Sequence, residues 1–537
     1  MCAAVGVRSL RAPERSGHDL ASWMVKLGGL RVMRRPRSSA RFVQASSPMA
    51  NARSVLFAAS ECAGLVKTGG LGDVVAALPA ALKARGMDAR VVLPRFDVIS
   101  TKGLEKLPGA LGVPLGGQEE WCSVYQGKLA GTEVPVYFLD HHGFYGRGYL
   151  YDPPAGHAAD NLRRFAFLSR GALQLCKMLG WAPDILHVHD WPTALAPLYL
   201  NDFERKGPLA RTASVLTIHN LAHQTRFAGA QLVTTGLPAS ELRADSLEEY
   251  GSINPLKGGL YHANLITAVS PTYAREIRTP QGGAGLDHVT RFRGADLVGI
   301  LNGIDDVVWD PASDPHLPAR FAAQDLSGKA VCKRELQREL GLDERPDVPL
   351  LGVISRLTEQ KGTDVILAAL DRLLALGTQV VVLGSGGPGA EGYLATRSSS
   401  GNGNFRAWIG FSERMAHRIE AGADLFLMPS RFEPCGLNQL YSQRYGTLPV
   451  VRATGGLDDT VDNYDASKGT GTGFKMQLLS EDALVGTVAW AVDTYRNHPA
   501  EFRNMQLRAM GKEFGWGPAA EAYQRAYGWA MERLVEE

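Results

Sequence analysis

Short apolar runs alternate with amphipathic helical patterns along the first half of the chain. The runs are near-continuous, which is typical of strands buried on both faces of a parallel sheet. Helices connect and cover such strands, so the pattern predicts a doubly wound α/β domain. The expected strands are 54–59, 89–96, 184–190, 214–220 and 264–270.

The second half repeats this pattern and predicts a second doubly wound domain. Ligands of open α/β sheets bind beyond the carboxyl ends of the strands, so two such domains facing each other predict a deep cleft. The expected strands are 350–357, 379–386, 405–412, 424–430 and 448–456, with a helix at 363–377.

The apolar pattern is interrupted near residues 300–311, where Asn302-Gly303 and Pro311 are typical of a turn. This interruption indicates the join between the two domains. The expected parts of the chain are a leader at 1–50, Rossmann-like domains at 51–300 and 301–517, and a helix at 518–537 that crosses back to the first domain.

Length and composition agree with two domains. The 537 residues exceed what a single core organises, and 45% apolar with 21% charged residues is typical of globular proteins. Apolar runs stop short of the ~18 residues that a membrane span needs, so no membrane partner is expected. The six cysteines are scattered without Cys-x-x-Cys spacing, which indicates neither a zinc site nor a disulfide framework.

Charge separates residues 1–50 from the rest of the chain. This leader holds eight Arg and one Lys against Glu14 and Asp19, a net +7, which leaves a net −5 for the remainder. A basic, acid-poor leader predicts an organelle transit peptide, with an Arg-rich unstructured tail as the alternative. Composition alone does not separate a mitochondrial from a plastid address. The acidic remainder argues against a nucleic-acid partner.

A glycine-rich turn, KTGGLGDV (67–74), lies between the first expected strand and a helix-like stretch. Gly69 and Gly70 let backbone N–H groups approach a phosphate, the helix start adds partial positive charge, and Lys67 adds a full charge. The sequence therefore predicts a diphosphate cradle, with a plain strand-to-helix turn as the alternative.

Two cations follow an expected strand of the second half, in SRLTEQKG (355–362). Arg356 and Lys361 would stabilise the charge that develops on a departing diphosphate. Solvated surface cations are the alternative.

A carboxylate and a helix start lie together in PSRFEPCGLNQL (429–440). Glu433 is expected either to contact a sugar or only to favour the helix dipole. The N–H groups of Gly436 and Leu437 would lie near a diphosphate. Cys435 has no partner base in the sequence, so we expect it to pack or lie near the ligand rather than to act as a nucleophile.

Histidines end two expected strands of the first half. His187 and His189 in HVHD share one side of a strand, and His219 ends another. Satisfied strand-end histidines are one interpretation, and a metal-dependent hydrolase that binds its metal through these three residues is another.

The strings KTGGLGDV, HVHDW, THNLAHQ, SRLTEQKG and SRFEPCGLNQLYSQRYGT, in this order, resemble the ADP-glucose-dependent starch synthases of plants and glycogen synthases of bacteria. The resemblance extends from residue 54 to about 530. It implies the GT-B fold and transfer of glucose from ADP-glucose, with retention of configuration, to the 4-hydroxyl at the non-reducing end of an α-1,4-glucan such as starch, glycogen or a malto-oligosaccharide. It also implies that no cofactor or metal is needed and that the leader directs the chain to the plastid stroma.

The resemblance further implies which residues form the site. Tyr441 stands where related retaining transferases often have a second Glu, and the starch synthase family expects only the first. A catalytically inactive glucan-binding scaffold, a UDP-glucose-dependent transferase and a phosphorylase remain alternatives. The expected catalytic residues are Glu433, His189, Asp160, Arg356 and Lys361, and the expected substrate-binding residues are Lys67, Gly69, Gly70, Asn161, Asn254, Cys435, Gly436, Leu437, Gly455 and Gly456.

Overall fold

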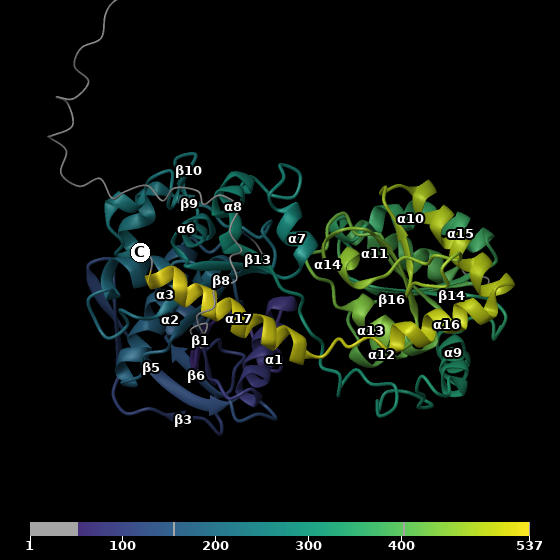
Figure 1. The fold of residues 1–537 in the computed structure, drawn as a ribbon, viewed down its shortest axis with the longest axis horizontal. Coiled ribbons are helices and arrows are strands. Elements are labelled where there is room, and N and C mark those ends of the chain that lie inside the picture. Colours follow the sequence, from purple (N-terminus) through teal and green to yellow (C-terminus); the bar gives the residue numbers. More distant parts are fainter. Residues whose placement is uncertain (1–51, 154–155, 401–402, 536–537) are drawn as a thin grey trace, which may run out of the picture.

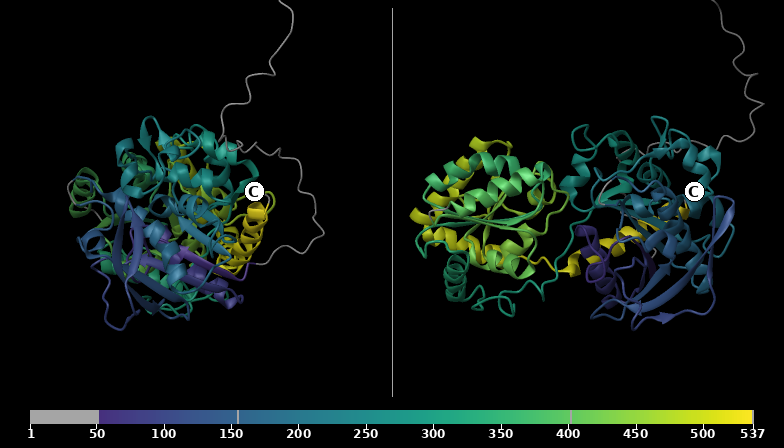
Figure 2. Two further views of the ribbon diagram at one scale, coloured as in Figure 1. Left: turned by 90° about the vertical axis from the view of Figure 1, so that its left-hand side faces the viewer. Right: turned by 180° about the vertical axis from the view of Figure 1, so that it is seen from behind.

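The chain folds into two lobes that lie side by side along the long axis of the molecule, as the computed structural model shows (Figure 1). The structure describes residues 52–153, 156–400 and 403–535. The predicted leader at 1–50 lies outside the described residues. The view from behind shows the same two lobes and one sheet at the centre of each (Figure 2).

The first lobe is built on a 10-stranded sheet with the order β13-β12-β8-β7-β1-β2-β6-β5-β3, and β4 pairs with β5. The strands from β13 to β6 run parallel, and β3, β4 and β5 form an antiparallel extension at one edge. The strand bounds are β1 (Ser54–Ala58), β2 (Asp88–Pro94), β3 (Glu105–Lys106), β4 (Leu111–Leu115), β5 (Gln118–Lys128), β6 (Pro135–Asp140), β7 (Ile185–His189), β8 (Ala213–Ile218), β12 (Leu265–Ala268) and β13 (Leu297–Gly299).

Helices cover both faces of this sheet, and a small three-stranded sheet lies at its side. The central strands are fully buried, because helices shield them above and below. The helices are α1 (Gly70–Ala84), α2 (His142–Tyr145), α3 (Asn161–Met178), α4 (Asp190–Thr193), α5 (Ala196–Tyr199), α6 (Pro255–His262), α7 (Pro271–Glu276) and α8 (Asp287–Arg293), and the small sheet holds β9 (Phe227–Ala228), β10 (Glu248–Glu249) and β11 (Ser252–Ile253).

The second lobe is built on a six-stranded parallel sheet with the order β16-β15-β14-β17-β18-β19. Its strands are β14 (Leu350–Ile354), β15 (Gln379–Gly384), β16 (Phe405–Ile409), β17 (Leu425–Met428), β18 (Leu448–Arg452) and β19 (Phe474–Met476). Its helices are α9 (Ser327–Leu340), α10 (Thr363–Ala375), α11 (Pro388–Ser399), α12 (Glu413–Gly422), α13 (Asn438–Arg444), α14 (Gly455–Thr460), α15 (Glu481–Asn497) and α16 (Pro499–Met510).

The last helix, α17 (Trp516–Val535), returns to the first lobe and lies across it (Figure 1). The Tyr527 hydroxyl is 2.8 Å from Nδ1 of His187 in β7. Arg533 pairs with Asp296 at 2.8 Å. α17 therefore completes the core of the first lobe, although it comes last in the chain.

The predicted fold class, two doubly wound α/β units, is confirmed. The structure adds what the strand prediction lacked: β4, β5 and β6 fall between two expected strands. The strand expected at 405–412 ends at Ile409, because Gly410 has a φ of +122° that leaves the extended conformation. None of the helices in the described residues combines the length and apolar character needed to cross a bilayer.

Candidate active site

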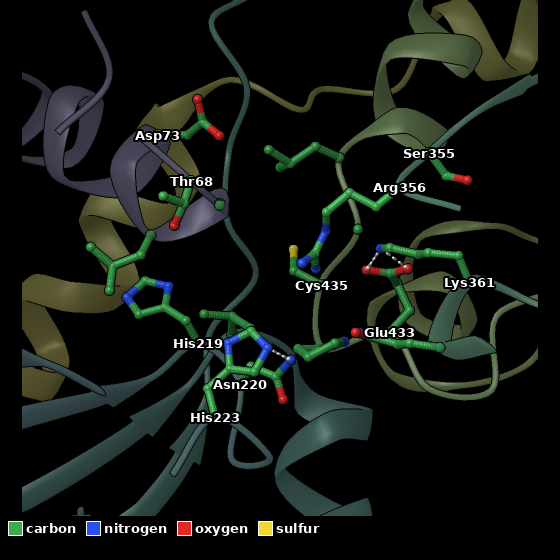
Figure 3. Close-up of a pocket in the computed structure, with 18 of the residues that line it drawn as sticks. Thr68, Asp73, His219, Asn220, His223, Ser355, Arg356, Lys361, Glu433 and Cys435 are labelled. Carbon is green, nitrogen blue, oxygen red and sulfur yellow. Dashed lines mark hydrogen bonds and ion pairs between the residues drawn. The ribbon is translucent and has the colours of Figure 1, made fainter. Parts of the chain in front are cut away.

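A cavity of about 600 Å³ lies between the two lobes and is lined by residues of both. It lies at the carboxyl ends of the central strands, where open α/β sheets bind ligands. Figure 3 shows side chains of the two lobes pointing toward each other across it. Among the predicted site residues, those that line it are Lys67, Gly69, Gly70, Arg356, Lys361, Glu433, Cys435, Gly436 and Leu437.

The glycine-rich turn carries a carboxylate partner that sequence analysis did not predict. Glu61 is almost fully buried and accepts hydrogen bonds from the N–H groups of Thr68 (2.6 Å) and Gly69 (3.2 Å). It also accepts one from the Thr68 hydroxyl at 2.7 Å. Lys67 pairs with Asp73 at 2.6 Å. The Gly69 N–H that was expected to bind phosphate is therefore engaged by an internal carboxylate, because Glu61 lies at the positive start of α1.

The second lobe presents an ion pair to the cavity. Nζ of Lys361 lies 2.8 and 2.6 Å from the two carboxylate oxygens of Glu433 (Figure 3). The Ser430 hydroxyl donates to the same carboxylate at 3.1 Å. Arg356 extends from the segment after β14 into the cavity (Figure 3). Arg356, Lys361 and Glu433 thus line one wall of the cavity, and their roles in catalysis stay a prediction.

The segment between β17 and α13, residues 429–437, is here called the Glu433 loop. Burial raises the pKa of the Cys435 thiol to about 12, so the thiol stays protonated and is a poor nucleophile. Gly455 and Gly456 do not line the cavity. A Cβ at either position would lie about 2 Å from the carbonyl oxygens of Glu433 and Cys435, at 1.9 and 2.0 Å. These two glycines therefore allow α14 to pack directly against the Glu433 loop.

Three histidines cluster at the ends of β7 and β8. Nδ1 of His189 lies 3.0 Å from Nε2 of His219, which lines the cavity. Burial holds the pKa of His189 well below its usual range and lowers that of His219 to about 3. Both rings are therefore neutral near pH 7. Nε2 of His189 has no hydrogen-bond partner within the described residues, but the His189 side chain is fully buried and does not line the cavity.

The metal-hydrolase interpretation lacks a ligand set. Both ring nitrogens of His187 are engaged, one with Tyr527 at 2.8 Å and the other with Thr217 at 2.6 Å. Across the residues that the structure describes, no group of three or more His, Cys, Asp or Glu is arranged to hold a metal ion. His187 therefore fits a satisfied strand-end histidine better than a metal ligand.

Three further predicted residues lie outside the cavity lining. Asp160 precedes α3 but makes no capping bond, and its carboxylate pairs with Arg147 at 2.7 Å. Asn161 donates to Asp152 at 3.0 Å, and Asp152 does line the cavity. Asn254 caps α6 through the Lys257 N–H. A direct contact of these residues with substrate stays a prediction.

Sequence analysis missed several residues that line the cavity. Tyr151 donates to Glu61 at 2.5 Å and so lies beside the glycine-rich turn. Asp190, next to His189, accepts from the His219 N–H at 2.8 Å, and burial raises its pKa to about 7. Asp190 directly follows β7 and Glu61 comes three residues after the end of β1, so their position at strand ends was the available signal.

Comparisons with known proteins give consistent matches over both lobes. Residues 54–292 match the family described as starch synthase catalytic domain, and residues 333–505 match glycosyl transferases group 1. Glycogen synthase 1 of Geobacter sulfurreducens is 48% identical over 486 residues, which cover 90% of this chain and 97% of the relative. Glycogen synthase of an Anaeromyxobacter species is 50% identical over 475 residues, covering 88% and 98%.

A solved structure matches the fold. The catalytic domain of starch synthase IV from Arabidopsis thaliana, bound to ADP and acarbose, has a TM-score of 0.83 and 35% identity to this chain. The match covers 90% of this chain and 100% of that one.

Proposed function

The chain belongs to the starch and bacterial glycogen synthase family of glucosyltransferases, and from this membership we propose how its cavity works. The enzyme elongates an α-1,4-glucan by transferring glucose from ADP-glucose, with retention of configuration, to the 4-hydroxyl at the non-reducing end. The observation that supports the site best is the cavity itself, because it brings cations from both lobes together with the buried carboxylate of Glu433.

We propose that the diphosphate of the donor binds between Lys67, Arg356 and Lys361. These cations offset the charge that grows on the leaving group as the glycosyl bond breaks. In the free protein Lys67 and Lys361 pair with Asp73 and Glu433. A diphosphate would compete for both lysines, so donor binding is expected to rearrange these ion pairs.

The glucose of the donor is proposed to lie between Glu433 and the histidine cluster. Glu433 would bind sugar hydroxyls or stabilise the positive charge that develops on the glycosyl carbon. Because His189 and His219 are neutral, they offer a hydrogen-bond donor or acceptor without repelling that positive charge. The donor already contains its leaving group, so the protein mainly positions the reactants and excludes water.

The proposal is tested by incubating the full chain with ADP-glucose or UDP-glucose, each with and without glycogen. We expect ADP release that depends on glycogen, and at least a tenfold loss in Glu433→Ala, with folding intact. ADP release without glycogen would indicate a hydrolase. A preference for UDP-glucose would refute ADP-glucose as the donor. Glycogen binding without any release would favour the scaffold interpretation.

We further propose that residues 1–50 direct the chain to a plastid. The support is the composition of this leader, with eight Arg and one Lys against two acidic residues, together with the resemblance to the starch synthases of plants. Residues 1–50 fused to a fluorescent protein should accumulate in plastids of plant cells. A matched fusion with Arg34, Arg35 and Arg37 changed to Gly should accumulate less, and cytosolic fluorescence of the unchanged fusion would contradict the proposal.

A further inference from the structure

The short helix α7 of the first lobe contacts the second lobe next to its catalytic carboxylate. In Figure 1, α7 and α14 face each other where the two lobes meet. Three groups of hydrogen bonds join the lobes here. The Ser270 hydroxyl donates to the Pro434 carbonyl at 2.6 Å, and the N–H and hydroxyl of Thr272 each donate to the Asp459 carboxylate at 2.7 Å. The Glu276 carboxylate accepts from the Thr454 hydroxyl at 2.9 Å and from the Gly455 N–H at 3.0 Å.

On the second lobe, these contacts reach the backbone of Glu433. The Gly456 N–H donates to the Glu433 carbonyl at 3.1 Å. α14 approaches the Glu433 loop so closely that only glycine fits at its first two positions. Whatever holds α14 therefore also holds the backbone that carries the Glu433 side chain.

On the first lobe, α7 is held rigidly. A Cβ at Gly299 of β13 would lie 2.4 Å from the Pro271 Cα, so the strand and the helix start are in close contact. The Tyr273 hydroxyl accepts from the Leu221 N–H at 2.8 Å. Leu221 follows His219 and Asn220, which line the cavity. α7 is thus bonded to both walls of the cavity.

We propose that Ser270, Thr272 and Glu276 are positioning residues that align Glu433 with the His219–Asn220 wall. The inference rests on the proposed transfer reaction, in which Glu433 and the histidine cluster act on the same sugar. Turnover is more sensitive to such alignment than substrate binding is. A displacement of a catalytic group by about 1 Å can lower the rate up to ~100-fold, while the contacts that bind the ligand persist.

The test compares Thr272→Val and Glu276→Ala with the wild-type full chain. We expect kcat to fall about tenfold, while KM for glycogen and the dissociation constant for ADP change less than about twofold. Glu276→Gln keeps an acceptor oxygen and should restore most of the turnover. Asp459→Asn probes the same contact from the other lobe and should lower kcat in the same direction. Unchanged kcat in Thr272→Val and Glu276→Ala, or equal losses in kcat and ADP affinity, would overturn the proposal.

A matched pair of serines separates positioning from helix capping. Ser270 caps α7 and Ser480 caps α15, each accepting a backbone N–H at 3.1 Å. Both Ser→Ala variants lose a cap, and only Ser270→Ala also loses a bond between the lobes. We expect kcat to fall in Ser270→Ala alone, and an equal fall in Ser480→Ala would contradict a positioning role.

Hydrogen exchange gives a readout that does not depend on turnover. The backbone amides of Glu433, Cys435, Gly436, Leu437 and Gly456 should exchange faster in Glu276→Ala than in wild type. If wild type released no ADP, the proposed function would fail, and this exchange result would still decide whether α7 holds the loop. Identical exchange in the two proteins would refute the inference.

Discussion

Replacing Lys361 by methionine removes one charge and keeps most of the side-chain length. In the structure, Nζ of Lys361 contacts both carboxylate oxygens of Glu433, whose side chain is 6% exposed against 19% for Lys361. Only the Ser430 hydroxyl would still donate to the Glu433 side chain within the described residues. The variant therefore leaves a nearly buried carboxylate with one neutral partner.

The expected cost follows from this geometry. Breaking a buried ion pair by removing one partner costs about 3–5 kcal/mol, and the partial exposure of Lys361 moves the estimate to roughly 2–3 kcal/mol. Replacing both partners by apolar groups, as in Lys361→Met with Glu433→Leu, removes the unpaired charge. The double variant should therefore recover most of the lost stability, to within about 1 kcal/mol of wild type.

Turnover should behave differently from stability. Lys361 is also proposed to stabilise the departing diphosphate, so Lys361→Met should lower glycogen-dependent ADP release at least tenfold. The double variant should stay inactive although it is stable. Urea midpoints and ADP release, measured on wild type, Lys361→Met and the double variant, test both parts.

Two outcomes would refute this reasoning. Unchanged stability in Lys361→Met would show that the pair leaves no uncompensated charge when it is broken. Near-normal turnover in Lys361→Met would remove Lys361 from the catalytic machinery, and near-normal turnover in the double variant would remove both residues.

Three further predictions concern the same cavity. Burial raises the pKa of Asp190 to about 7, so between pH 4 and 6.5 the folded state holds a proton that the unfolded chain has lost. Asp190 alone therefore lowers the free energy of unfolding by about 1.4 kcal/mol for each unit of rising pH in this window. Asp190→Asn removes this contribution, so the free energy of unfolding, measured from urea midpoints, should increase more with pH than in wild type. Burial lowers the pKa of His219 to about 3, so in the same window the unfolded chain holds the extra proton, and His219→Phe should make the free energy of unfolding increase less with pH than in wild type. Slope changes of the opposite sign would contradict the shifted pKa values of Asp190 and His219. Arg356→Ala removes one charge-assisted contact and should weaken ADP binding, measured by calorimetry, about tenfold, whereas unchanged affinity would exclude Arg356 from the diphosphate site.

Sequence analysis predicted those parts of the molecule that depend on local pattern. Buried strands such as β1 and β7 have near-continuous apolar sequences, and the expected ranges agree with them within two residues. The cavity residues Arg356, Lys361 and Glu433 were found because each follows such a strand, and strand ends meet at one edge of a sheet.

Contacts between distant segments could not be predicted in this way. Thr272 and Asp459 are 187 positions apart, and a threonine hydroxyl gives no sign in sequence of which carboxylate it will meet. The glycine pair of TGGL, Gly455 and Gly456, has the composition of a phosphate-binding turn. In the structure these two glycines have no Cβ that would clash with the backbone of the Glu433 loop, so they allow close packing instead of binding phosphate. Sequence alone does not distinguish these two roles of glycine.

The return of α17 to the first lobe affects how the chain can be made. A ribosome completes the strands of the first lobe long before it synthesises Tyr527, the partner of His187 in the middle of the sheet. The first lobe therefore stays incompletely packed until α17 has been synthesised. A premature stop codon just before α17 would leave the strands of the second lobe in place and damage the lobe encoded first.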